Sequence, residues 1–188
     1  MLIGRQIRAT TYHDPCPITQ AASRHHSLFQ HEGLARQMLI SLKYNHALWT
    51  VPILGDMLVE AMRVTGDDQA LVMPIPMHWR RRAQQGYNPP GLLARWVARS
   101  LRVPMRARTL VRLQHKPPQQ SLSREERLSN MVGCFALRGR LPRKVTVIDD
   151  VYTTGATLRE AVATLNRDNI EVSAWVITQT DVSTVPST

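Results

Sequence analysis

Residues 145–157, VTVIDDVYTTGAT, carry the pattern that decides the fold. Val145 to Ile148 is a β-branched apolar run of strand length, and the polar residues 149–156 are typical of a turn. Residues 157–166 then predict a helix, and residues 172–178 form a second apolar run. Strand, helix and strand at this spacing form a βαβ unit, so the sequence predicts a parallel sheet.

Two acidic residues, Asp149 and Asp150, stand where the first strand is expected to end. In open α/β sheets, ligands bind in the crevice at this edge. The loop that follows offers backbone N–H groups at a helix N-terminus, which favours a phosphate. Carboxylates repel a phosphate, so we expect the two acids to accept hydrogen bonds from sugar hydroxyls, with a metal ion nearby. Together these features describe a site for a ribose 5-phosphate.

An ordinary helix start is the alternative interpretation of this segment. It explains one aspartate as an N-cap and one threonine in the first turn. It leaves the second aspartate and the rest of the run TTGAT without a reason, so we favour the ligand site.

Working outward, helical and strand patterns alternate along the chain. The expected elements are helices beginning at Gly33, Pro52 and Pro89-Pro90, a strand over 70–74 followed by a basic loop, and an amphipathic strand over 105–113. Residues 115–121 read as an exposed loop. We divide the chain into an N-terminal segment, 1–31, a single α/β domain, 32–180, and a tail, 181–188.

Positive charge is concentrated in the middle of the chain. The formal net charge is +10, and 21 of the 24 basic residues are arginines. Residues 77–127 hold twelve basic and two acidic residues, an excess of ten, and the remainder of the chain sums to zero. Such a localised, arginine-rich excess predicts a surface that faces a polyanion.

Other classes of protein are disfavoured by composition. No uncharged apolar run of about 18 residues is present, so we expect no membrane span, and the first residues lack the apolar core of a secretory signal. Cys16 and Cys134 are too few for a disulfide framework and too far apart for a metal-ligand pair, so we expect a cytoplasmic protein without zinc. Cys134 is expected in the core, and a metal site among His25, His26 and His31 is disfavoured.

Several segments of the sequence resemble a known protein family. Residues 147–157 are similar to the phosphoribosyl pyrophosphate (PRPP) motif of type I phosphoribosyltransferases. Four further segments, in the same order, resemble the ComF/GntX family of competence and DNA-utilisation proteins: LISLKY at 39–44, PIPMH at 74–78, QGYN at 85–88 and QSLS at 120–123. The likeness covers roughly residues 34–180. The chain departs from the family in having no paired N-terminal cysteines, and in Gln85, where an arginine is usual.

The resemblance implies a fold and a set of roles. It implies a mainly parallel central sheet flanked by helices, with a small hood or lid region. Asp149 and Asp150 would bind the ribose hydroxyls, directly or through Mg²⁺. The remaining implied site residues are the 5-phosphate loop Thr153, Thr154, Gly155, Ala156 and Thr157; the pyrophosphate loop Pro76, His78, Arg80, Arg81 and Arg82; and the lid residues Gln120, Ser121, Arg124 and Arg127.

Two functions are compatible with these residues. One is Mg²⁺-dependent transfer of a phosphoribosyl group from PRPP to an unidentified acceptor; no general base is assigned, because Thr153 stands where related salvage enzymes carry an aspartate. The other is a PRPP- or nucleotide-sensing module that also binds single-stranded DNA. A solvated arginine run and an unstructured connector are the alternatives for the pyrophosphate loop and the lid. The partners expected are PRPP, single-stranded DNA, other DNA-uptake proteins and a second copy of the chain.

Overall fold

The computed structural model describes residues 10–12, 24–68, 70–113 and 133–180, and the following account is confined to them. The elements, in chain order, are β1 (Thr10–Tyr12), β2 (Arg24–Gln30), α1 (Gly33–Tyr44), α2 (Thr50–Thr65), β3 (Leu71–Pro74), α3 (Trp79–Gln85), α4 (Pro89–Leu101), β4 (Leu110–Arg112), β5 (Phe135–Leu137), β6 (Lys144–Tyr152), α6 (Ala156–Asn166) and β7 (Glu171–Gln179). Among these helices, none has the length and apolar character needed to cross a bilayer.

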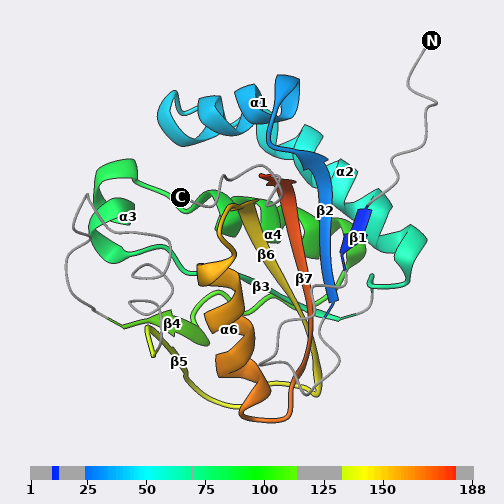
Figure 1. Cartoon of the computed structure of the whole chain (residues 1–188), viewed down its shortest axis with the longest axis vertical. Helices are drawn as coiled ribbons and strands as arrows, with labels where there is room; N and C mark the ends of the chain where they lie inside the picture. The colour runs from blue at the N-terminus through cyan, green and yellow to red at the C-terminus, as the bar shows by residue number, and fades with distance from the viewer. Residues whose placement is uncertain (1–9, 13–23, 69, 114–132, 181–188) are drawn as a thin grey trace, which may run out of the picture.

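The central sheet has the strand order β1-β2-β7-β6-β3. β2, β7, β6 and β3 run parallel, and β1 is antiparallel at the edge. The carboxyl ends of the parallel strands meet at one edge, near which α1 lies (Figure 1). The predicted mainly parallel sheet is therefore confirmed.

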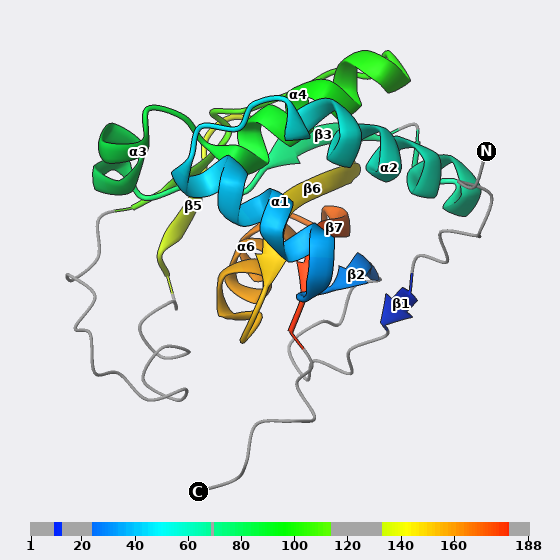
Figure 2. The ribbon, with the colours of Figure 1, turned by 90° about the horizontal axis from the view of Figure 1, so that it is seen from above.

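Helices cover both faces of this sheet. α2 and α4 lie on one face and α6 on the other, as Figure 2 shows from above, while α1 lies over the carboxyl ends of the strands and packs its buried residues against the same core as α2 and α4. Leu42, Leu58 and Trp175 are fully buried on the first face, whereas Val147 and Leu165 are fully buried on the second. β4 and β5 pair antiparallel in a small sheet beside the main one.

Local sequence signals set the ends of most elements. Pro89 opens α4 at its first position, where a missing N–H costs nothing. Gly66 ends α2 with φ 74°, a left-handed conformation that glycine adopts without strain. Gly55 of α2 lies so close to the ring of Trp96 in α4 that a Cβ there would overlap it. The two helices approach closely because position 55 has no side chain.

Three predictions about local structure were wrong or incomplete. β6 continues through the acid pair to Tyr152, because residues 149–152 pair with Val176–Gln179 of β7 instead of turning. The predicted basic loop is helical from Trp79, since arginine, alanine and glutamine favour a helix once its first turn has closed. Of the strand predicted over 105–113, only β4 and an isolated bridge from Met105 to Val72 are present.

The N-terminal segment contributes to the same sheet. β2 pairs in parallel with β7 along most of its length. Residues 24–30 therefore belong to the main sheet, and the predicted domain boundary after residue 31 comes directly after one of its strands. The tail 181–188 lies outside the described residues.

Candidate functional site

Asp149 and Asp150 lie near the carboxyl end of β6. Successive side chains of a strand point to opposite faces, so the two carboxylates diverge at the edge of the sheet. The backbone N–H of Asp150 donates a hydrogen bond of 2.9 Å to Oδ1 of Asp149. Asp150 is buried, with 8% of the residue exposed. The pair therefore consists of two acids in different surroundings.

Lys43 is the cation that meets this pair. Its Nζ lies 3.0 Å from Oδ2 of Asp150, and the two side chains are 18% and 12% exposed. Lys43 is in the last turn of α1, more than one hundred residues before the strand. Sequence reasoning did not assign it to the site, although it belongs to the LISLKY segment on which the resemblance partly rested.

The electrostatics of the acid pair follow from burial and crowding. Burial, together with the negative charge of Asp150, raises the pKa of Asp149 to about 7. The positive charges of Lys43 and Arg112 oppose this rise without cancelling it. Arg112, on β4, is therefore a second residue near the site that sequence reasoning missed. An acid held in this way is stabilised by any ligand that donates hydrogen bonds or brings positive charge.

His31 borders the same group of charges. Its Nδ1 lies 2.7 Å from Oγ1 of Thr178 at the end of β7. Burial lowers the pKa of His31, and the charges of Lys43 and Arg36 lower it further. Burial and these charges therefore favour the neutral form of the His31 ring.

Residues 153–155 connect β6 to α6, so the connection is shorter than the predicted turn over 149–156 and the helix begins one residue earlier, at Ala156. Thr153 is exposed, while Gly155 and Ala156 are buried. Gly155 has φ 72°, and a Cβ at this position would overlap the phenol of Tyr152. The loop is closed by the Arg159 guanidinium, which donates to the carbonyl of Thr154. Its backbone thus packs tightly against Tyr152 at the N-terminus of α6.

Pro76 and His78 leave the sheet next to β6. The N–H of Ile75 donates to the carbonyl of Ile148 at 2.8 Å, and Nδ2 of Asn88 donates to the carbonyl of Ile75 at 3.0 Å. The segment 76–78 therefore starts beside the acid pair. Arg80, Arg81 and Arg82 follow in α3, so they belong to a helix and not to the loop itself.

The QGYN segment has a structural task. The hydroxyl of Tyr87 donates to the carbonyl of Leu42, the residue before Lys43. Asn88, as described above, holds the exit from β3. These two side chains tie α1 and the segment 76–78 to the same turn, and so fix Lys43 relative to the sheet.

The predicted lid residues Gln120, Ser121, Arg124 and Arg127 lie outside the described residues. On the described side of that segment, the N–H of Gly133 donates to Oε1 of Glu160 in α6 at 2.8 Å. Cys134 is buried, as expected, and burial raises the pKa of its thiol to about 11. The thiol is therefore a packing group and not a nucleophile.

The N-terminal histidines are distributed over different environments. His25 packs its ring on Tyr152, with 4.4 Å between centroids, and His26 stacks on Trp175. In the part of the chain that the structure describes, no three His, Cys, Asp or Glu side chains gather as metal ligands.

Asp149 and Asp150 are the oxygen donors that a hard cation such as Mg²⁺ takes, and they fit a metal that shares its coordination with ligand oxygens.

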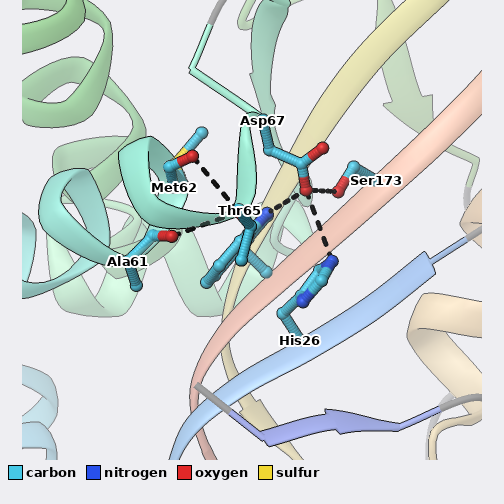
Figure 3. Close-up of polar contacts among 7 residues, drawn as sticks. His26, Ala61, Met62, Thr65, Asp67 and Ser173 are labelled. Atoms are coloured by element: carbon cyan, nitrogen blue, oxygen red, sulfur yellow. Dashed lines mark hydrogen bonds and ion pairs between the residues drawn. The ribbon is translucent and has the colours of Figure 1, made fainter. Parts of the chain in front are cut away.

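A second buried polar cluster lies toward the amino-terminal ends of the strands (Figure 3). Oδ2 of Asp67, which follows α2, accepts hydrogen bonds from Ser173 at 2.5 Å and from Nε1 of Trp175 at 3.1 Å, and lies 3.3 Å from Nε2 of His26. Despite burial, these hydrogen bonds lower the pKa of Asp67. The cluster joins the end of α2 to β2 and β7.

Known proteins similar to this chain fall into two groups. No family model matches it. The chain is 29% identical over 143 residues to competence protein F of Haemophilus influenzae, covering 71% of this chain and 62% of that protein. It is 30% identical over 131 residues to the DNA utilization protein YhgH of Escherichia coli O157:H7, covering 65% and 55% respectively. The chain thus spans little more than half the length of these relatives.

Among solved structures, the chain is similar to adenine phosphoribosyltransferases. That of Leishmania tarentolae aligns with a TM-score of 0.51 and 13% identity, covering 92% of this chain and 95% of that one. That of Leishmania donovani gives the same TM-score and identity, with coverage of 92% and 87%. At this level of identity the likeness concerns the fold.

Proposed function

We propose that this chain, a relative of the ComF proteins with the type I phosphoribosyltransferase fold, binds PRPP and transfers its phosphoribosyl group to an acceptor. The observation that carries the proposal is the acid pair near the carboxyl end of β6, followed by a tightly packed Thr-Thr-Gly-Ala turn at the start of α6. Carboxylates can accept hydrogen bonds from two neighbouring sugar hydroxyls, and a turn at a helix N-terminus can bind a phosphate. With only a few residues between them, these two groups suit a ribose 5-phosphate.

Each part of the ligand has a complementary group in this site. Asp149 and Asp150 accept hydrogen bonds from the ribose hydroxyls, and the turn 153–157 receives the 5-phosphate. The diphosphate lies toward the segment 76–78, with the arginines of α3 supplying positive charge. Mg²⁺ would be held mainly by oxygens of the diphosphate, with the acid pair close by, and it would neutralise charge on the departing group.

The reaction we propose is a substitution at the anomeric carbon. The bond from C1 to the diphosphate oxygen breaks with its electron pair, pyrophosphate leaves, and a bond forms between C1 and a nucleophilic atom of the acceptor. The turn 153–157 contains no carboxylate. Either the acceptor therefore reacts without losing a proton first, or a base outside this turn takes that proton.

Thermal unfolding tests PRPP binding. A ligand present at about 100 times its dissociation constant should stabilise the folded state by about 2.7 kcal/mol. We expect this gain for the wild type with Mg²⁺ and PRPP, and its loss in Asp149→Asn/Asp150→Asn. Asp168→Asn, an exposed change after α6, is the control and should respond as the wild type does. A wild type with no shift, or an equal shift in the double variant, would contradict the proposal. Release of pyrophosphate, screened over bases, amines and nucleotides, then identifies the acceptor.

A binding module for PRPP and single-stranded DNA is the second candidate. Aromatic side chains are exposed near α3: Trp79 is 52% exposed, Tyr44 66% and Trp49 64%. His46, which follows α1, packs its ring on Tyr87, which follows α3, so the segments bearing these aromatic residues are neighbours. Exposed aromatic rings among arginines are typical of surfaces that stack on unpaired bases.

The triple variant Arg80→Ala/Arg81→Ala/Arg82→Ala separates the two candidates. If α3 binds the diphosphate, calorimetry should show that the variant loses far more affinity for PRPP than for ribose 5-phosphate. The expected loss is roughly 1.5–3 kcal/mol for each lost contact. If α3 serves DNA, the preference for PRPP over ribose 5-phosphate stays unchanged. Binding of single-stranded DNA then falls, and in the wild type it weakens steeply with salt.

A further inference from the structure

Lys43 is a charged residue near the candidate site to which neither the sequence nor the comparisons assign a role. We propose that Lys43 is a positioning residue that acts as the fixed counter-cation of Asp150, so that the ribose hydroxyls bind without a metal ion bridging the two aspartates. This inference rests on the proposed function. It assigns the metal dependence of PRPP binding to the diphosphate part of the ligand.

The first support is the placement of the ion pair. Nζ of Lys43 lies 3.0 Å from Oδ2 of Asp150, and both side chains are mostly buried. An exposed pair such as Lys144 with Glu171 is separated by 3.5 Å, and its lysine is 69% exposed. Screening by water weakens the exposed pair, whereas the buried one retains most of its attraction. A buried carboxylate next to another acid requires such a partner, because desolvated like charges repel strongly.

The second support is that the lysine is held in place by the fold. Leu42, its neighbour in α1, is fully buried in the core, and its carbonyl accepts the hydroxyl of Tyr87. The next turn is closed by the N–H of Asn45, which donates to the carbonyl of Ser41 at 3.0 Å. The end of α1 is therefore anchored on both sides of Lys43. An anchored ammonium fixes the direction of the carboxylate that it binds.

The third support is that the two acids have different hydrogen-bond partners. One oxygen of Asp149 accepts the backbone N–H of Asp150, and one oxygen of Asp150 binds Lys43. A metal bridging both carboxylates would have to compete with the ammonium for Asp150. In the arrangement described here, the positive charge that a bridging metal would bring to Asp150 is already supplied by the chain.

Calorimetry with ribose 5-phosphate and with PRPP, each in EDTA and in saturating Mg²⁺, tests this inference. For the wild type we expect ribose 5-phosphate to bind equally well in both conditions, within about twofold, and PRPP to gain from Mg²⁺. Lys43→Met should weaken ribose 5-phosphate in EDTA by about ten- to hundredfold, the range of a lost charge-assisted contact. Mg²⁺ should recover part of that loss, because the metal then becomes the counter-cation. Lys144→Met is the matched control and should behave as the wild type does.

Lys43→Arg provides a second variant should the methionine protein fail to fold. It keeps the positive charge, so binding of ribose 5-phosphate should remain independent of Mg²⁺. Unchanged affinity of Lys43→Met in EDTA would overturn the inference and leave PRPP binding intact. A wild type whose affinity for ribose 5-phosphate requires Mg²⁺ would overturn it as well. A wild type that binds neither ligand would instead overturn the proposed function, and this inference with it.

Discussion

The carboxylates at the two edges of the sheet differ in the hydrogen-bond donors that surround them. Asp67 lies toward the amino-terminal edge, and the pair Asp149 and Asp150 lies near the carboxyl-terminal edge. One oxygen of Asp67 meets a serine hydroxyl, an indole N–H and an imidazole nitrogen. Among the described residues, the pair has one hydrogen-bonded lysine and one backbone N–H, with the charge of Arg112 nearby. The pKa of Asp67 is accordingly lowered, and burial together with Asp150 raises the pKa of Asp149 to about 7.

This difference separates a structural carboxylate from a functional one. Donors that are built into the fold stabilise the ionised form of Asp67 and join α2 to β2 and β7. At the other edge the fold leaves two acids close together with fewer donors, a state that costs stability unless a ligand relieves it. Strongly perturbed acids near the carboxyl end of a parallel strand are typical of binding sites.

The largest effect on stability is expected at the amino-terminal cluster. Asp67→Ala leaves Ser173 and the buried Trp175 and His26 without their shared acceptor, so the free energy of unfolding should fall by about 3 kcal/mol. Asp56→Ala is the control, because Asp56 also accepts an indole N–H, that of Trp96 at 2.7 Å, but at the surface. It should cost less than about 1 kcal/mol. Equal losses in urea denaturation would mean that the Asp67 cluster is not a buried network.

A smaller difference in the free energy of unfolding is expected between alanine substitutions of two glycines, Gly155 before α6 and Gly66 after α2. Both Gly155 and Gly66 have positive φ, but a Cβ at Gly155 would overlap Tyr152, whereas nothing lies within 4 Å of one at Gly66. Gly66→Ala should therefore cost about 1 kcal/mol from backbone strain alone. Gly155→Ala should cost about 2–3 kcal/mol, because the ring or the turn must also move. Thermal unfolding of both variants checks this, and similar losses would show that the turn adapts freely.

A third effect concerns the pH dependence of stability and has opposite signs at the two edges of the sheet. The folded protein holds the Asp149 proton up to a pKa of about 7, against 3.8 for the unfolded chain, so this residue lowers stability as pH rises between those values. Asp149→Asn should therefore gain stability over the wild type as pH rises from about 4 to about 7, and no gain should remain near pH 4.

Asp67 provides the opposite case in the same experiment. Its pKa is lowered, so its contribution to stability is present above the unfolded value and is lost as pH falls through the folded one. The deficit of Asp67→Asn should therefore shrink in acid, while the advantage of Asp149→Asn appears on raising the pH. Urea unfolding in EDTA at several pH values measures both. Parallel pH profiles for the two variants would contradict the comparison.

Much of the fold could be predicted because its signals are local. The β-branched run before Asp149, the helix after Gly155 and Pro89 at the start of α4 each state a preference within a few residues. The extension of β6 through the acid pair could not be predicted in this way. It depends on β7 offering backbone partners to residues 149–152.

The sequence by itself determined that two adjacent acids precede a small-residue turn in a βαβ unit, because strand, turn and helix signals occupy one continuous stretch. Only the tertiary structure decided which cation meets those acids. Lys43 lies on α1 and reaches Asp150 because α1 packs over the carboxyl end of the sheet and Tyr87 holds its last turn. Periodicity indicates which face of a helix is buried but not which strand residue it meets, since that contact depends on how distant elements pack.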